Sequence, residues 1–435
     1  MKFRTFLSLG LVSAGLTYAQ AAFSDDSASI ERGRYVAIAA DCVACHTNPA
    51  DGRVFGGGYA LKTPFGTLLA SNITMDKETG IGSWTEEQFT RAVRDGIGKD
   101  GEHLYAAMPY PSYTKMTDQD MHDLWSFMKT VQPVSNKVIS NQLPFPFNIR
   151  ASLIFWNLWN FRGGRFTPDT NKSAEWNRGA YLVEALEHCN ACHTPKNFLG
   201  GDLKSKAYYG TSLQGWYAPN ITNSKSLGIG TWSKDDLVTY LKTGSVHYYV
   251  ASGPMGEAIE HSTQHLTDSD LSAIAEYFAT VNGPEIQNGR LALSETDPQM
   301  RRGKAVYEYA CEACHKHDGT GVTTMIAGFP GNQVIRADVT DTLIHTVLVG
   351  GRGAITHSNP TGAAMPTFAW TLNDEQIAAA LTYIRNNWGN SASAVTASDV
   401  AKIRSSVEIK QVGPVPDDWS LPGFRAGLKN DSLQK

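Results

Sequence analysis

Several features that would place a chain in a common functional class are missing from this one. Its formal charge is −4, and no block of basic residues suggests a nucleic-acid partner. It has no glycine-rich dinucleotide fingerprint, no motif of an activated nucleophile and no second metal site. Only six of its 435 residues are cysteine. We therefore expect no catalytic residues in the usual sense, and the six cysteines become the main chemical signal.

Long apolar runs are missing too, apart from one near the start. A charged opening, an apolar run from Phe6 to Tyr18 and the segment Ala19-Gln20-Ala21 predict a signal peptide over residues 1–21. A retained anchor is the alternative, but the run is short for a bilayer, which needs about twenty apolar residues. No other stretch approaches that length, so no spanning helix is expected in the mature chain. We expect export to the periplasm.

The six cysteines all lie in three copies of one pattern, Cys-x-x-Cys-His, which is typical of c-type haem attachment. Each pair of thiols would bond to one porphyrin, and the following histidine would bind its iron. The pattern therefore predicts three covalent haem c groups. The attachment residues are Cys42 and Cys45, Cys189 and Cys192, and Cys311 and Cys314, and the iron ligands are His46, His193 and His315.

Other uses of the same cysteines fit less well. A zinc site needs four ligands close together, whereas these pairs are separated by the length of a domain. A thioredoxin-like dithiol is expected once, in a βαβ context, and not three times with a histidine each time. No cysteine is left over for a disulfide.

Each motif sits inside a longer repeat. A helix with an Arg-Gly opening precedes every motif, and its glycine (Gly33, Gly179 or Gly303) would allow a second helix to cross closely. An amphipathic helix ends every repeat, with Thr117, Thr267 or Asn373 as the expected N-cap. This final helix carries an aromatic residue at one equivalent place, namely Phe127, Tyr277 and Tyr383.

This repeat predicts an all-α chain of three tandem cytochrome c-type haem domains joined by long linkers. The first two repeats share Asn-Ile-Thr strings, Asn72-Ile73-Thr74 and Asn220-Ile221-Thr222, which the third lacks. The predicted units are a signal peptide (1–21), domain 1 (23–131), an aromatic-rich linker (132–173), domain 2 (174–283), a linker (284–298), domain 3 (299–391) and a C-terminal tail (392–435) with a helix over 395–407. We call residues 23–131, 174–283 and 299–391 the first, second and third regions.

A sixth iron ligand would decide between an electron carrier and a haem enzyme. Met108 and Met365 each precede a proline between the haem motif and the final helix. Met255 has no such proline, but it follows His193 at the same spacing at which Met108 follows His46. These three methionines would close the irons, because a thioether ligand leaves no open position. The alternatives are core packing for each methionine, and other ligands from His247, His261, His265, Met75, Met116, Met121, Met128 and Met325.

The linker carries an unusual density of aromatic residues around a helix expected over 149–161. These side chains either pack on the chain's own domains or contact a partner subunit or the periplasmic membrane surface.

With these motifs in place, the chain resembles the triheme cytochrome c subunits of bacterial membrane-bound dehydrogenases. Further strings that carry the resemblance are Gly57-Gly58-Tyr59, Thr63-Pro64-Phe65-Gly66, Met108-Pro109-Tyr110 and Pro146-Phe147-Asn148-Ile149-Arg150. The resemblance implies a catalytic subunit that oxidises a sugar, sugar acid or alcohol with FAD or pyrroloquinoline quinone (PQQ). It also implies a small third subunit and ubiquinone as the electron acceptor.

Within this family, the chain's length favours the gluconate 2-dehydrogenase type over fructose dehydrogenase and quinoprotein alcohol dehydrogenase. The resemblance implies that the chain is not an enzyme by itself. A self-contained peroxidase-like haem enzyme and a free periplasmic electron shuttle are the alternatives.

Overall fold

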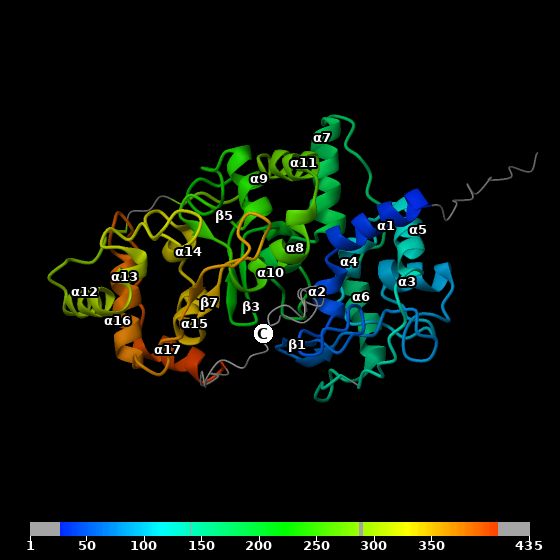
Figure 1. The fold of residues 1–435 in the computed structure, drawn as a ribbon, viewed down its shortest axis with the longest axis horizontal. Helices are drawn as coiled ribbons and strands as arrows, with labels where there is room; N and C mark the ends of the chain where they lie inside the picture. The colour runs from blue at the N-terminus through cyan, green and yellow to red at the C-terminus, as the bar shows by residue number, and fades with distance from the viewer. Residues whose placement is uncertain (1–26, 140, 287–289, 408–435) are drawn as a thin grey trace, which may run out of the picture.

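The computed structural model describes residues 27–139, 141–286 and 290–407, and within them the chain is rich in helices (Figure 1). These residues also contain four two-stranded antiparallel sheets. The expectation of an all-α chain therefore holds for the main elements and misses four short hairpins. The predicted signal peptide and the tail beyond residue 407 lie outside the described residues.

Similar elements surround each of the three motifs. The first region contains α1 (Ser27–Ala39), α2 (Cys42–His46), β1 (Ala60–Thr63), β2 (Gly66–Leu69), α3 (Glu86–Asp95), α4 (Tyr110–Tyr113) and α5 (Asp118–Met128). The linker contains η1 (Arg150–Ser152) and α6 (Leu153–Asn160).

The second and third regions are built from the following elements. The second contains α7 (Ala174–Tyr181), η2 (Leu182–Leu186), α8 (Asn190–His193), η3 (Lys204–Lys206), β3 (Thr211–Leu213), β4 (Trp216–Ala218), α9 (Lys234–Thr243), β5 (Ser245–Val246), β6 (Tyr249–Val250), α10 (Gly253–His261), η4 (Thr263–His265) and α11 (Asp268–Phe278). The third contains α12 (Pro298–Ala310), α13 (Glu312–His315), α14 (Gln333–Arg336), α15 (Asp341–Val349), β7 (Gly351–Arg352), β8 (Ala364–Met365) and α16 (Asp374–Arg385), and α17 (Ala397–Arg404) follows it.

In every region the first helix crosses the last one at a glycine, as predicted. A Cβ on Gly33 would lie 1.8 Å from the carbonyl oxygen of Asp123 on α5. The same atom on Gly179 or Gly303 would lie 1.9 Å or 2.1 Å from a carbonyl oxygen of α11 or α16. The aromatic residues predicted at the equivalent place are the next neighbours at each crossing, namely Phe127, Tyr277 and Tyr383. Only glycine permits so close a contact.

The final helices begin where the sequence predicts. The side chains of Thr117 and Thr267 accept the backbone N–H of the residue three positions on, at the start of α5 and α11. Asn373 does the same for α16 and forms a full capping box with Gln376. These bonds satisfy N–H groups that a helix leaves without partners in its first turn, which fixes the start of each helix.

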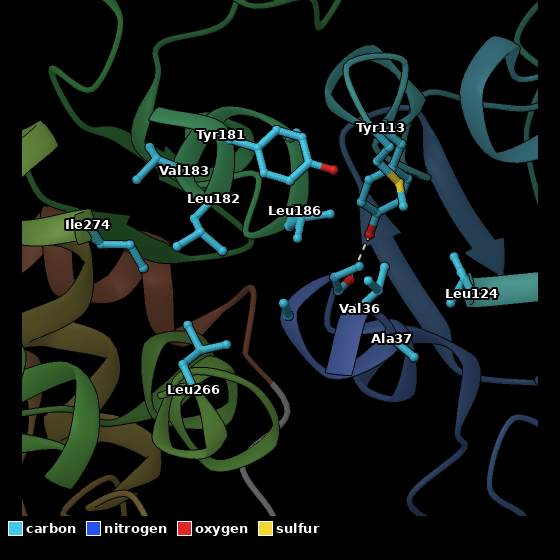
Figure 2. Close-up of a cluster of buried hydrophobic side chains, with 14 of the residues drawn as sticks. Val36, Ala37, Tyr113, Leu124, Tyr181, Leu182, Val183, Leu186, Leu266 and Ile274 are labelled. Atoms are coloured by element: carbon cyan, nitrogen blue, oxygen red, sulfur yellow. Dashed lines mark hydrogen bonds between the residues drawn. The ribbon is translucent and has the colours of Figure 1, made fainter. Parts of the chain in front are cut away.

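A single apolar core runs through the first and second regions. It joins residues of α1 and α5, such as Val36 and Leu124, to residues of η2 and α11, such as Leu182 and Ile274 (Figure 2). Within it, the hydroxyl of Tyr113 donates to the carbonyl oxygen of Ala40 at 2.7 Å. The third region has a separate core around α12, α15 and α16. Figure 1 shows the three regions in a row, with the second in the middle.

Two tyrosines tie the first and second regions together reciprocally. The hydroxyl of Tyr35 on α1 donates to Asp270 at 2.7 Å and accepts the backbone N–H of Thr267, the N-cap of α11. At the equivalent position, the hydroxyl of Tyr181 on α7 donates to Asp120 and accepts the N–H of Thr117, the N-cap of α5. Each region therefore supports the start of the other's final helix.

The third region contacts the second through different groups. Arg352 on β7 forms an ion pair with the buried Glu260 of α10 at 3.1 Å. The backbone N–H of Ile355 donates to the same carboxylate at 2.7 Å. Between β4 and α15, the rings of Trp216 and His345 lie 4.3 Å apart.

The linker helix forms close to the predicted range, as η1 followed by α6. The helix predicted over 395–407 is present as α17, which is shorter at both ends. Among the described residues, none of the helices combines the length and apolar character that a membrane span requires.

Candidate haem sites

A short helix ends at the histidine of each Cys-x-x-Cys-His motif and begins at the first cysteine or at the residue after it. These helices are α2, α8 and α13. One helical turn places the two cysteines and the histidine next to one another, since residues three or four apart share a face. The cysteines of all three motifs are at least partly accessible to solvent. A covalent ligand can therefore approach every pair.

The three motif histidines share one hydrogen-bond arrangement. Nδ1 lies 2.7 Å from the carbonyl oxygen of Ser71 for His46, and 2.7 Å from that of Pro219 for His193. For His315 the partner is the carbonyl oxygen of Ala327, at 2.8 Å. A carbonyl oxygen can only accept, so Nδ1 carries the proton and Nε2 presents its lone pair. This tautomer and fixed ring orientation are what an iron ligand requires.

The Asn-Ile-Thr strings explain how two of these carbonyls are positioned. Ser71 directly precedes Asn72, whose side-chain oxygen accepts the N–H of Thr74 at 2.9 Å and its hydroxyl at 2.7 Å. Pro219 directly precedes Asn220, which binds Thr222 in the same way at 2.8 Å and 2.6 Å. Each string folds into a tight local turn that fixes the preceding carbonyl. The sequence shows the strings as a repeat, but it does not reveal this role.

The third motif uses another support. Its histidine ring stacks on Phe329, with ring centroids 4.5 Å apart and planes at 24°. Phe329 follows shortly after Ala327, the carbonyl partner of His315. The third region lacks an Asn-Ile-Thr string, and this aromatic contact orients the histidine in its place.

The protonation of the motif histidines agrees with a role as metal ligands. Burial lowers the pKa of His46, His193 and His315, and their hydrogen bonds to carbonyls oppose this only in part. The neutral rings that can bind a metal are therefore favoured. The residues present thus fit a covalently bound haem.

The three predicted methionine ligands all lie on half-buried positions before the final helix. Met108 is in the turn before α4, and Met365 is in β8, so neither methionine before a proline is helical. Met255 differs, because it lies in the first turn of α10. Met108 and Met255 pack at the edge of the shared core. Their role as iron ligands stays a prediction.

Several competing ligands are engaged elsewhere. The imidazole Nε2 of His247 lies 2.7 Å from a carboxylate oxygen of Asp236, and that of His265 lies 3.1 Å from the carbonyl oxygen of Glu260. Met116, Met121 and Met128 are fully buried in the shared core, and Met325 is more than half exposed. Met75 is partly buried and packs against the same core, and His261 is half-buried on α10. Their complete burial among apolar side chains favours core packing for Met116, Met121 and Met128.

The first and second motifs lie close to each other. Helix α10, which carries Met255, packs against α2 of the first motif. The hydroxyl of Ser112, next to α4's end, lies 3.2 Å from the side-chain oxygen of Asn190 in the second motif. Two attached cofactors would therefore be held in one continuous body.

Comparison with known proteins agrees with this picture. The sequence profile of the cytochrome c family matches residues 30–132 and 300–388, which contain the first and third motifs. The fructose dehydrogenase cytochrome subunit of Gluconobacter japonicus is 42% identical over 402 residues, covering 87% of this chain and 83% of that protein.

Two further relatives align over most of their length. The gluconate 2-dehydrogenase cytochrome c subunit of Pantoea cypripedii is 38% identical and covers 92% of this chain and 96% of that protein. The cytochrome c subunit of alcohol dehydrogenase (quinone) from Gluconobacter oxydans is 37% identical and covers 93% and 87%. With its haem motifs, its supported histidines and these relatives, the chain belongs to the family of cytochrome c subunits of bacterial dehydrogenases.

Proposed function

We propose that the chain binds three haem c groups and carries electrons from a dehydrogenase catalytic subunit to ubiquinone in the membrane. In this proposal the three regions are three cytochrome c domains with the predicted bounds 23–131, 174–283 and 299–391. The signal peptide would export the chain, so that the complex works on the periplasmic side of the cytoplasmic membrane. A small third subunit is part of the same proposal.

The observation that carries the proposal is the shared orientation of the three motif histidines. Each donates its Nδ1–H to a backbone carbonyl, so each presents Nε2 to the side where an iron would lie. A haem held in this way would supply reversible one-electron exchange. The chain's own residues attach the group, fix the histidine tautomer and exclude water from one face. Met108, Met255 and Met365 would close the opposite face, so that no small substrate reaches the metal.

The dehydrogenase partner sets the substrate in this proposal. The related subunits are named for fructose, gluconate and alcohol dehydrogenases, although they are similar cytochromes. We favour a gluconate 2-dehydrogenase type partner with FAD, which is supported by an alignment over 96% of that relative. The identity of 42% to the fructose dehydrogenase subunit favours that enzyme as the second candidate, and a PQQ-dependent partner is the third.

The middle site offers the sharpest test, because Met255 lacks the Met-Pro string of the other two. Met255→Ala should open one iron, lower one of three midpoint potentials and leave the other two unchanged. Potentiometric titration of the purified holoprotein measures all three. Met116→Leu is the control, since Met116 is a buried core residue of the first region. Three unchanged potentials in Met255→Ala would show that another residue holds the second iron.

The alternative functions make different predictions. A peroxidase-like enzyme needs one iron without a protein ligand on its open face, and it would bind carbon monoxide when reduced. A free shuttle would purify without a partner. Affinity purification from detergent-solubilised membranes should recover a dehydrogenase subunit with this chain, and recovery of the chain alone would favour the shuttle.

A further inference from the structure

The linker helix α6 exposes apolar side chains and turns a polar side chain toward the protein, which is the reverse of an ordinary surface helix. Its apolar side chains Phe155 and Trp159 are 74% and 70% exposed, and Ile154 and Leu158 lie beside them on the same face. Its polar residue Asn157 faces the protein and accepts the hydroxyl of Tyr110 at 2.6 Å. A surface helix normally buries its apolar stripe and exposes its polar one. The exposed apolar face of α6 is therefore unexplained by the fold of this chain.

Two loops extend this apolar face. One precedes η1 and contains Phe145, which is 79% exposed, and the other belongs to the second region and contains Phe198, which is 82% exposed. The indole N–H of Trp156 donates to the carbonyl oxygen of Leu199 at 2.8 Å and so joins the second loop to α6. We define the aromatic face as these exposed residues together: Phe145, Phe147, Ile149, Ile154, Phe155, Leu158, Trp159, Phe198 and Leu199.

Polar contacts with the first region fix the segment that precedes α6. Arg150 donates to the carbonyl oxygen of His103 at 2.8 Å, and its guanidinium lies over the ring of Tyr105. The hydroxyl of Tyr105 donates to the carbonyl oxygen of Phe147 at 2.8 Å. Polar contacts to the first region thus keep the apolar side chains pointing outward. Monomeric proteins seldom expose so many large apolar side chains in one segment unless these side chains bind something.

The linker segment that carries most of the aromatic face has charged residues of one sign. Residues 124–168 contain no aspartate or glutamate, although the chain as a whole has more acidic than basic residues. The same stretch contains Lys129, Lys137, Arg150, Arg162 and Arg165. Arg150 and Arg162 lie at the two ends of the η1–α6 helix, and the hydrogen bonds of Arg162 go to backbone carbonyls. Positive charge at the rim of an apolar, aromatic face complements the anionic headgroups of a phospholipid surface.

We propose that the aromatic face inserts into the interfacial layer of a membrane that contains anionic phospholipids. Helix α6 would lie flat there, with its aromatic rings among the upper acyl chains and Arg162 near the phosphates. An interface with a protein partner would be expected to contain hydrogen bonds around its apolar centre. The exposed side chains of α6, which are Ile154, Phe155, Leu158 and Trp159, are apolar apart from the indole N–H of Trp159. This inference goes beyond the proposed function by naming the surface that contacts the bilayer. It rests on the proposed function only for the purpose of that contact, which is to bring the electron carrier to ubiquinone.

Vesicle binding by the purified holoprotein tests the proposal. Co-sedimentation should be stronger with vesicles of phosphatidylcholine and phosphatidylglycerol than with phosphatidylcholine alone. The double variant Phe155→Ser/Trp159→Ser should bind the mixed vesicles about tenfold less tightly or worse, because two large apolar side chains no longer enter the lipid. Arg162→Gln should weaken binding to the anionic vesicles and leave binding to neutral ones unchanged.

The third region provides a matched control. Tyr309 and Trp370 are as exposed as the two replaced residues but lie outside the aromatic face, so Tyr309→Ser/Trp370→Ser should bind like the native chain. Unchanged haem spectra would establish that all variants are folded. The proposal is overturned if the Phe155→Ser/Trp159→Ser variant sediments like the native chain. It is also overturned if that variant keeps vesicle binding but loses the dehydrogenase subunit, which would make the face a protein interface.

Electron transfer is measured in parallel: the holoprotein is first reduced chemically, and its reoxidation by a water-soluble quinone is followed with no lipid present. The Phe155→Ser/Trp159→Ser variant should reduce that quinone at the native rate. If the native chain fails to do so, the proposed acceptor is wrong, while the vesicle results still decide the membrane contact.

Discussion

The junction between the first and second regions differs from the junction between the second and third. The first junction is symmetric in kind, since Tyr35 and Tyr181 each bind the N-cap region of the other region's final helix, and one core runs through both. The second junction has only a small apolar cluster, and polar contacts form most of it: the Arg352–Glu260 ion pair and several hydrogen bonds, such as that from the backbone N–H of Ala354 to the carbonyl oxygen of Ala251. Ala305 stands where the tyrosines would be in the third region. The first two regions are thus built as one unit to which the third is attached.

The largest effect is expected at the helix crossings. Gly179→Ala would place a methyl group 1.9 Å from a carbonyl oxygen of α11, and Gly303→Ala would do the same to α16 at 2.1 Å. Each should lower the free energy of unfolding by about 3 kcal/mol. Because of the shared core, Gly179→Ala should loosen the first and second regions together, while Gly303→Ala should loosen the third alone. Hydrogen exchange followed by mass spectrometry locates the loss of protection. If the first region of Gly179→Ala exchanges its amide hydrogens as slowly as in the native chain, the first two regions do not form a single unit.

A smaller effect is expected from the reciprocal tyrosines. Tyr35→Phe or Tyr181→Phe removes a hydroxyl that both donates to a carboxylate and accepts a helix N–H, which should cost about 1–2 kcal/mol each. Denaturant unfolding of the first two regions measures the loss. Tyr309→Phe is the control, because Tyr309 is almost fully exposed in the third region, and it should change nothing. If the Tyr35→Phe and Tyr181→Phe variants also match the native chain, the two hydroxyls do not hold the junction.

The smallest effect concerns acid stability of the same junction. Burial disfavours the charge of Asp270, but hydrogen bonds from Arg178 and Tyr35 outweigh it and lower the pKa of Asp270. Such a group stabilises the fold above its unfolded pKa, and this stabilisation is lost as the pH falls through the folded pKa, below about pH 4. Asp270→Asn should therefore be less stable than the native chain at neutral pH and should lose less on acidification. Thermal unfolding between pH 3 and pH 7 compares the two chains, and parallel pH profiles would contradict this role.

Much of this account could be predicted from the sequence, because the relevant signals are local. The spacing of Cys42, Cys45 and His46 defines a haem motif, and the glycine at each helix crossing follows from its place in a repeat. The N-caps Thr117 and Thr267 are visible as a polar residue before an acidic first turn.

Other features depend on residues far apart in the chain, and no local pattern reveals them. Tyr35 and Asp270 are separated by 235 residues, and their contact exists only in the folded chain. The carbonyl of Ser71 that orients His46 has no side-chain signature, and only the neighbouring Asn72 hints at it. The density of aromatic residues in the linker leaves burial and exposure equally open. The structure resolves this by showing that Asn157 of α6 faces the protein, while Phe155, Leu158 and Trp159 are exposed.

The most direct test of the central claim, that each motif histidine holds a haem iron whose other face is closed, is a carbon monoxide titration of the reduced holoprotein at neutral pH. Iron and haem are counted in the same sample. We predict three haem c groups per chain, all low-spin and none binding carbon monoxide. A high-spin haem that binds the gas, or a count other than three, would contradict the account.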